Sequence, residues 1–411
     1  MKIVIATAVY YPMINGVAVF SHNLALGLAK RGHEVLVLTP SQTGKSHVVM
    51  EDGVRTEFLR SASLNMYPDQ IHQVPEKKKI FGKALPHLFY KNGFKVSVFP
   101  RGEIKEILDK FDPDVVHVQV SDPIGLSVVS YARKRGIPIV TTEHNQPEVL
   151  TEPMHMAKVF EKPTNAILSA YFKNRQSKSD FVTMPTKQAI ENLLGNEKDF
   201  PVPVEAVSNG VDLTHFKPGE ADEDTFRRHG LEFDAPTVLY VGRVDPEKQV
   251  GKIAEAFLLA TKEVPEAQLV VVGDGVDRAK LVAEYGDNKK IHFLGRIVPP
   301  ELYDLYQVGD VFATASEIET QGIVLIEAAA VGLPLIAVNK GAVNEVCIDG
   351  ENGFLCEPGN IKEISEAMVK ILSDKKLQEK FSKRSIEIAK EHDFERTCDQ
   401  FIQIHHRLSE K

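Results

Sequence analysis

Short apolar runs alternate along the chain with longer stretches whose apolar residues recur at helical spacing. The short runs lack polar alternation, which predicts strands buried on both faces of a parallel sheet, joined by the helical stretches. The strands expected in the first half are Lys2–Thr7, Glu34–Leu38, Val115–Val118 and Ile137–Thr141, with a helix at Val17–Arg31. Those expected in the second half are Thr237–Val241, Gln268–Val272, Ile291–Leu294, Val311–Ala313 and Pro334–Ala337.

The pattern restarts after a turn-rich stretch at about residues 196–218, and 411 residues are too many for one compact core. We therefore expect an α/β protein with two Rossmann-like, doubly wound parallel-sheet domains facing across a cleft. The N-terminal domain is placed at residues 1–197 and the C-terminal domain at residues 198–390. The helical stretch within residues 391–411 fits either domain by its pattern, and we assign it to the N-terminal one.

Composition narrows the class of protein. With 43% hydrophobic and 26% charged residues, the chain resembles an ordinary soluble protein, and its net charge of −8 argues against a general nucleic-acid binder. Three cysteines without a CxxC pair argue against a disulfide framework or structural zinc and fit a reducing cytoplasm. The first residues lack a signal-peptide pattern, and no long apolar run predicts a membrane span. Any membrane contact would then be peripheral.

The segment Ser316–Gly322, followed by an apolar helical run that contains Glu327, carries the first candidate chemistry. The backbone N–H groups of Gly322, Ile323 and Val324 would open a helix, where unpaired amides and the helix dipole favour a diphosphate. The carboxylates of Glu319 and Glu327 suit sugar and ribose hydroxyls. The spacing of the two acids by itself is more typical of a plain surface helix.

Three further candidates follow predicted strands, where open α/β sheets bind ligands. Arg243 and Lys248 supply charges suited to two phosphates, although solvated side chains explain them equally well. Gly16 permits a close approach by an anion, or simply belongs to an ordinary turn. His144 suits a sugar hydroxyl, although a lone histidine at a strand end is more often structural. We find no metal-ligand spacing and no complete dinucleotide fingerprint.

Taken in order, these pieces resemble the GT4 family of retaining GT-B glycosyltransferases. The resemblance spans nearly the whole chain and rests on the glycine loop at Gly16, on Glu143-His144, and on Ser208–Asp212, Gly242–Lys248, Gly273–Gly275, Phe293–Gly295 and Glu319–Glu327. It implies two facing GT-B domains, retention of anomeric configuration, a nucleotide diphosphate sugar as donor, and no cofactor or catalytic metal.

The resemblance also implies roles for individual residues. Arg243 and Lys248 would hold the donor diphosphate together with the amides of Gly322, Ile323 and Val324. Glu327 would bind the ribose, and Glu319 the transferred sugar. His144 would face that sugar from the N-terminal domain, and Gly16 would approach phosphate or acceptor. Arg296 and Ile297 would line the base pocket. His144, Arg243, Lys248 and Glu319 form the catalytic set.

Two features point towards a lipid acceptor. The motif Glu319-Thr-Gln-Gly322 departs from the more common Glu-x-Phe-Gly and resembles the branch that transfers glucose to diacylglycerol. Residues 76–105 carry eight Lys or Arg against Glu76 and Glu103, with aromatic residues between them. Such a segment suits an anionic leaflet, although a solvated surface also explains it. The contact residues expected for the membrane are Lys77, Lys78, Lys79, Phe81, Lys83, Phe89, Tyr90 and Lys91.

The expected function is thus the transfer of a hexose, most simply glucose from UDP-glucose, to a membrane lipid at the cytoplasmic face of the cell membrane. A phosphatidylinositol-type lipid, a polysaccharide or a soluble small molecule remain alternative acceptors. A nucleotide-sugar 2-epimerase and a non-catalytic nucleotide-sugar-binding protein are the alternatives outside the transferases.

Overall fold

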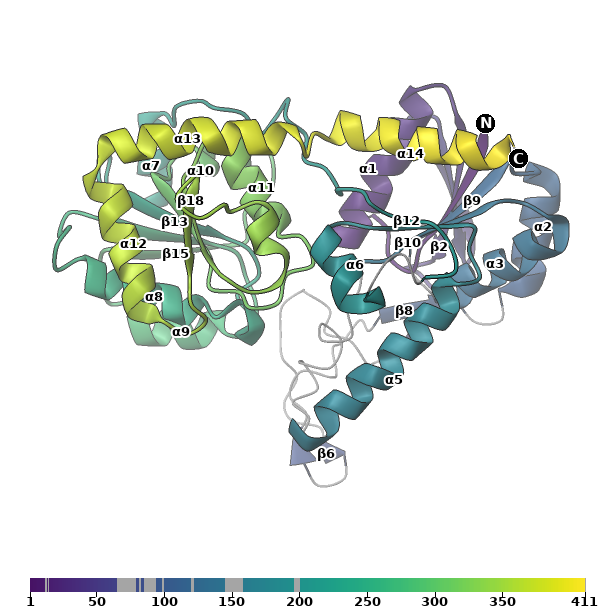
Figure 1. The fold of residues 1–411 in the computed structure, drawn as a ribbon, viewed down its shortest axis with the longest axis horizontal. Coiled ribbons are helices and arrows are strands. Elements are labelled where there is room, and N and C mark those ends of the chain that lie inside the picture. Colours follow the sequence, from purple (N-terminus) through teal and green to yellow (C-terminus); the bar gives the residue numbers. More distant parts are fainter. Residues whose placement is uncertain are drawn as a thin grey trace. The chain divides into compact units, whose positions relative to one another are not determined.

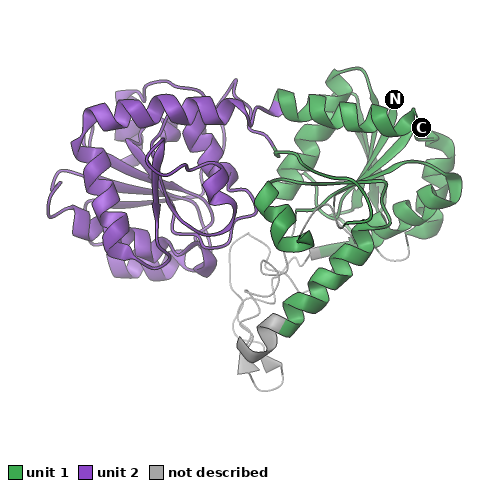
Figure 2. Cartoon of the chain, in the orientation of Figure 1, with its two compact units in different colours: residues 1–209, 395–411 green, residues 210–394 purple. Residues whose placement is uncertain are grey.

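The computed structural model describes residues 1–11, 13, 15–64, 79–80, 83–84, 94–97, 100–119, 122–144, 158–195 and 200–410. The chain folds into two compact units (Figure 2). Unit 1 comprises Met1–Asn209 and Glu395–Lys411, and unit 2 comprises Gly210–Phe394. The boundaries fall later than the residues 197 and 390 expected from the sequence. The reason is that strand β12 (Val204–Ala206) still pairs within the sheet of unit 1, while Asp393 bridges to Val211 within unit 2.

Unit 1 is built on an eight-stranded sheet in the order β12-β11-β10-β9-β1-β2-β4-β3. Strands β2, β9, β10 and β12 of this sheet are labelled in Figure 1. All pairs are parallel except β3 with β4. The strands in chain order are β1 (Lys2–Ala6), β2 (Glu34–Pro40), β3 (His47–Glu51), β4 (Val54–Leu59), β9 (Val115–Val118), β10 (Ile139–Thr142), β11 (Phe181–Met184) and β12. Two small antiparallel pairs join β5 (Ser61–Leu64) to β8 (Phe94–Ser97) and β6 (Lys79–Ile80) to β7 (Lys83–Ala84).

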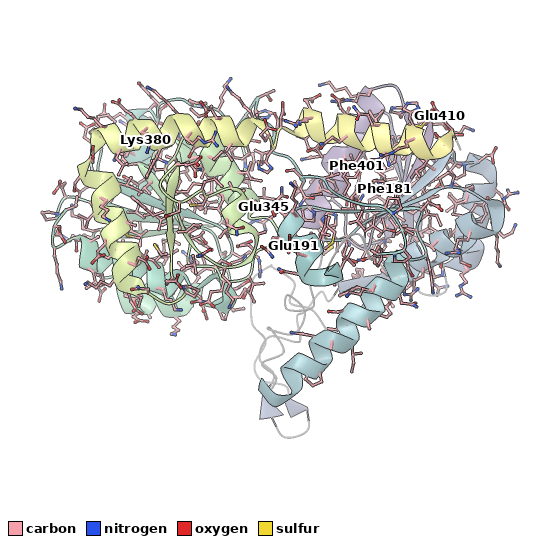
Figure 3. All side chains as sticks on the ribbon, in the orientation of Figure 1. Phe181, Glu191, Glu345, Lys380, Phe401 and Glu410 are labelled. Atoms are coloured by element: carbon pink, nitrogen blue, oxygen red, sulfur yellow. The ribbon has the colours of Figure 1, made fainter. Side chains whose placement is uncertain are left out.

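Helices cover both faces of the unit 1 sheet. One face packs against α2 (Arg101–Phe111) and α3 (Pro123–Arg135), through side chains such as Leu108 and Val128. The other face packs against α1 (Gly16–Lys30) and α14 (Phe394–Ser409), and Phe401 of α14 is labelled in Figure 3. The buried ring of Phe401 lies 5.0 Å from the ring of His117 on β9. The described part of unit 1 also contains α5 (Lys158–Gln176) and α6 (Lys187–Leu194). The C-terminal helix thus belongs to unit 1, since α14 completes the covering of that sheet.

Unit 2 contains a six-stranded parallel sheet in the order β15-β14-β13-β16-β17-β18. The order reverses between β13 and β16, as in a doubly wound Rossmann-like sheet. The strands are β13 (Thr237–Val241), β14 (Gln268–Val272), β15 (Ile291–Gly295), β16 (Val311–Ala313), β17 (Leu335–Val338) and β18 (Gly353–Cys356).

Alternate residues of these strands point to opposite faces, and each face has its own layer of helices. Val238 and Tyr240 pack with α8 (Val250–Ala260), α9 (Arg278–Tyr285) and α12 (Ile361–Ser373). Leu239 and Val241 pack with α7 (Glu223–His229), α10 (Glu301–Tyr306), α11 (Ile323–Ala330) and α13 (Lys375–Lys390). Two short 3-10 turns complete the unit, η3 (Pro246–Lys248) and η4 (Gly341–Glu345).

Every strand expected from the sequence is present, within two residues at either end. The strands β3, β4, β11, β12 and β18 and the two small antiparallel pairs were not expected. β3, β12 and β18 are short edge strands, where a polar or glycine-containing run gives little of the continuous apolar signal that marks interior strands. The interior strand β4 carries Arg55, Thr56 and Glu57 in its middle, and the interior strand β11 has only four residues, so neither forms a long apolar run.

Candidate active site

The loops that follow β13 and β16 contain most of the candidate residues of unit 2. These two strands are hydrogen-bonded neighbours, with Val238 paired to Val311, and the strand order reverses between them. Parallel strands end at the same edge of their sheet, so both loops leave at the topological switch point, where open α/β sheets bind ligands. The sheet order therefore brings the segment Gly242–Lys248 beside the segment Ser316–Gly322.

Lys248 and Glu319 meet at this edge. The Lys248 Nζ lies 2.6 Å from a carboxylate oxygen of Glu319, and only 16% and 14% of the two side chains are exposed. The backbone of the Glu319 loop is fixed by a hydrogen bond of 3.1 Å, which the Ala342 N–H donates to the Glu319 carbonyl. A Cβ on Gly341 would lie 3.1 Å from that same carbonyl oxygen, so the close packing there depends on glycine.

Arg243 lies in the same loop and is held by acidic neighbours. Its guanidinium forms ion pairs with Asp245 and Glu247, and about half of the side chain is exposed. The buried hydroxyl of Tyr240 donates to the Arg243 carbonyl at 2.6 Å and fixes the backbone below it. A Cβ on Gly273, at φ 146°, would lie 1.7 Å from the Gly242 carbonyl oxygen, so this tight packing of the two loops also requires glycine.

Helix α11 begins directly after this loop. Gly322 takes the left-handed conformation, φ 75°, at the N-cap, so the chain turns sharply and the amides that follow open the helix. Such amides are anion-binding groups.

Glu327 lies farther along α11 and is partly buried. It accepts a hydrogen bond of 2.5 Å from the hydroxyl of Tyr306 on α10. Burial raises the pKa of Glu327 to about 7, against a smaller lowering by this hydrogen bond. The sequence did not indicate a role for Tyr306 at this site, because a tyrosine in an amphipathic helix is indistinguishable from an ordinary core residue.

Arg296 and Ile297 follow β15, at the outer edge of the sheet. The carbonyl of Gly295, just before them, accepts a hydrogen bond of 2.8 Å from the Gly273 N–H. This bond joins the end of β15 to the loop that follows β14. Arg296 is exposed, while Ile297 packs against the core of unit 2. The two residues therefore follow a strand that lies two positions from β13 in the sheet.

In unit 1 the candidate His144 follows β10. It is buried and bonds through Nε2 to the Gln119 side-chain oxygen at 2.8 Å, with the ring of Phe20 edge-on at 5.1 Å. Burial lowers the pKa of His144 to about 3, so the imidazole is neutral near pH 7. Gly16 opens α1, and the Asn15 side chain caps that helix by accepting from the Ala18 N–H at 2.9 Å. Gln119 was not among the residues singled out from the sequence.

Most of the expected membrane residues lie outside the described residues: Lys77, Lys78, Phe81, Phe89, Tyr90 and Lys91. Lys79 and Lys83 belong to strands β6 and β7, and the structure does not describe their side chains. Among the described helices, none has the length and apolar character to cross a bilayer. In the described part of the chain, no three His, Cys, Asp or Glu side chains gather as a metal site would require.

Comparison with known proteins places both units in one class. Residues 14–215 match the model for "Glycosyltransferase Family 4", and residues 221–388 match the model for "Glycosyl transferases group 1". The alpha-monoglucosyldiacylglycerol synthase of Acholeplasma laidlawii is 27% identical, over 86% of this chain and 84% of that protein. A GDP-mannose-dependent alpha-mannosyltransferase of Mycolicibacterium smegmatis is 29% identical, over 87% and 84%. The structure of Anabaena Alr3699/HepE in complex with UDP-glucose superposes with a TM-score of 0.69, at 17% identity and full coverage of both chains.

The two Rossmann-like units and their match to these proteins define a glycosyltransferase with the GT-B fold. The chain belongs to the GT4 family of glycosyltransferases.

Proposed function

We propose that this enzyme transfers glucose from UDP-glucose to diacylglycerol, with retention of anomeric configuration, at the surface of an anionic membrane. The observation that carries the donor half is the pairing of Lys248 with Glu319 at the switch point of unit 2, directly before the Gly322 helix start. A cation, a carboxylate and a set of helix amides in one place match the needs of a sugar diphosphate: phosphate charge, sugar hydroxyls and bridging oxygens.

In this proposal the donor lies along the loops of unit 2. Lys248 and Arg243 bind the diphosphate with the amides of Gly322, Ile323 and Val324. Glu319 accepts hydrogen bonds from the transferred sugar, and Glu327 from the ribose. Arg296 and Ile297 hold the base. In unit 1 His144, as a neutral donor or acceptor, is assigned to a sugar hydroxyl, and Gly16 to the backbone approach of phosphate or acceptor.

The chemistry follows from where charge develops. As the bond between the anomeric carbon and the phosphate oxygen breaks, negative charge accumulates on the leaving diphosphate, where Lys248, Arg243 and the α11 amides stabilise it. Glu319 is assigned to sugar binding rather than covalent attack, since its carboxylate is engaged by Lys248. We therefore favour attack by the acceptor hydroxyl on the same face, with the leaving phosphate taking the acceptor proton.

Two observations support a lipid acceptor. One is the similarity to a synthase of monoglucosyldiacylglycerol. The other is the outer face of α5, where the side chains of Ile167 and Tyr171 are 70% and 43% exposed. The same helix carries Lys173 and Arg175, and Lys178 lies two residues beyond its end. The Arg175 guanidinium lies 5.0 Å from the centre of the Tyr171 ring. Exposed apolar side chains beside cations suit the headgroup region of an anionic bilayer.

The decisive experiment offers UDP-glucose, UDP-galactose and GDP-mannose in turn to the purified enzyme. Each donor is given diacylglycerol in phosphatidylglycerol vesicles, then phosphatidylinositol vesicles, then soluble glucans and small alcohols. We expect a glucolipid from UDP-glucose and diacylglycerol, with α-configuration by NMR. Transfer only to another acceptor would refute the lipid assignment and keep the transferase. An epimerised sugar without acceptor would favour a 2-epimerase, and nucleotide binding without turnover a regulatory protein.

A further inference from the structure

The hydrogen bond between Tyr306 and Glu327 joins a fully buried phenol to a carboxylate on the neighbouring helix. The Tyr306 side chain has no exposed surface, and its hydroxyl donates to Glu327 Oε2 at 2.5 Å. The second carboxylate oxygen, Oε1, accepts no hydrogen bond from the residues that the structure describes. One oxygen of Glu327 is thus held from inside the protein, and the other is left for a ligand.

Packing gives Tyr306 little freedom to move. Its ring lies 6.5 Å from Phe312 of β16 in a stacked arrangement, and 5.4 Å from Phe216 edge-on. The phenol pKa is raised well above its usual value, first by burial and then by Glu327, so the hydroxyl stays protonated and can only donate to the carboxylate. A donor held this rigidly selects one rotamer of the carboxylate that it binds.

We propose that Tyr306 is a positioning residue for nucleoside binding: its hydroxyl orients the Glu327 carboxylate and favours its ionised form, so that Oε1 accepts the ribose hydroxyls of the donor. This inference rests on the proposed function, which assigns Glu327 to the ribose. Tyr306 itself makes no contact with the nucleotide. Its effect on binding is transmitted through the charge and direction of one side chain.

A consequence is that nucleotide affinity depends on pH. The ribose needs the ionised carboxylate, and the Glu327 pKa is about 7, so affinity falls as the pH drops through neutrality. Tyr306 is the hydrogen-bonding group that opposes this protonation. Of the other ionisable groups nearby, Tyr303 of α10 and Tyr240 of β13 are phenols with raised pKa values, and Asp212 is paired with His215.

The test compares Tyr306→Phe with Tyr303→Phe by titration calorimetry of UDP and 2′-deoxy-UDP between pH 5.5 and 9, with GDP and 2′-deoxy-GDP used if UDP does not bind. Tyr303 is the matched control, since it lies on the same helix and its ring packs against His215 and Phe216, whereas the hydrogen bond to Glu327 comes from Tyr306. We expect Tyr306→Phe to weaken UDP binding about tenfold at pH 7, the effect of losing a hydrogen bond to a charged group. Its pH midpoint should move upwards, because the group that lowers the Glu327 pKa is gone.

Removing the 2′-hydroxyl from the ligand should weaken binding to the wild type but have little further effect in Tyr306→Phe. Glu327→Gln distinguishes a failure of the proposed donor site from a failure of the positioning role of Tyr306. If it leaves UDP affinity and its pH dependence unchanged, the ribose role of Glu327 is wrong and the proposed donor site fails. If Glu327→Gln weakens binding while Tyr306→Phe behaves like Tyr303→Phe, the donor site stands and the positioning role is overturned.

Discussion

The ammonium group of Lys248 lies 2.6 Å from the Glu319 carboxylate, although the two residues come from loops after different strands. Each is assigned to a different part of the donor, the lysine to phosphate and the glutamate to sugar. The two charges neutralise one another in a mostly buried setting, which avoids the free-energy cost of an unpaired buried charge.

Replacing Lys248 by alanine should lower kcat about 100- to 1000-fold, because charge on the leaving diphosphate would lose its nearest cation. Lys252→Ala is the matched control: this lysine is close in sequence but pairs with Glu317 at 3.6 Å. Steady-state release of nucleoside diphosphate measures the turnover of both variants. Near-normal turnover of the Lys248 variant would contradict the assignment.

Glu319→Gln should separate nucleotide binding from transfer. Loss of the charged hydrogen bond to the sugar should lower kcat/KM about 10- to 100-fold. The affinity for UDP alone should stay equal or increase, since Lys248 no longer has its internal partner. Calorimetry with UDP and a transfer assay give the two values. Weakened UDP binding would assign Glu319 to the nucleotide instead, and Glu317→Gln controls for the loss of a neighbouring acid.

Three buried histidines should make unit 1 sensitive to acid. His405 of α14 lies 3.3 Å from His117, and burial lowers the pKa of His405 and of His144 to about 3, while that of His117 is also lowered. The unfolded chain takes up these protons near its ordinary pKa of about 6.5. The stability contributed by the neutral rings is therefore complete above pH 6.5 and is lost as the pH falls towards 3.

Below pH 6.5 the free energy of unfolding should fall by up to about 1.4 kcal/mol per pH unit for each of these histidines. Urea unfolding followed by circular dichroism from pH 7 to 4.5 measures the slope. His405→Gln removes one titrating group and should flatten it, whereas the exposed His406→Gln should not. Equal slopes for both variants would show that burial of His405 contributes nothing to acid sensitivity.

The outer face of α5 should govern vesicle binding. The double variant Ile167→Glu, Tyr171→Glu introduces two acids where the proposed contact needs apolar side chains, so sedimentation with phosphatidylglycerol vesicles should fall at least tenfold. Phe233→Glu places an acid at an equally exposed ring in unit 2 and should leave binding unchanged. Turnover of donor with a water-soluble acceptor confirms that each variant is folded. Unaltered sedimentation of the double variant would exclude this surface.

The sequence predicted much of the fold because most interior parallel strands form continuous apolar runs. Thr237–Val241 is buried at every position, and its ends were predicted to the residue. The interior strand Phe181–Met184 was not predicted, since its four residues form only a short run. The edge strand His47–Glu51 was missed, since all of its residues are exposed and no burial shapes their composition. The domain boundary was predicted at residue 197, earlier than the division after Asn209, for a similar reason. β12 is only partly buried, and its sequence resembles that of a turn-rich linker.

By itself the sequence determined the alternation of strands and helices, the residues that follow each strand, and the resemblance to GT4 enzymes. It could not decide which of these residues meet, because strand order is set by crossover connections and packing rather than by local pattern. Only the fold placed β13 beside β16 and so brought Lys248 to Glu319, across 71 positions of sequence. Only packing revealed that Tyr306 reaches Glu327, since a buried phenol acquires its partner from a neighbouring helix.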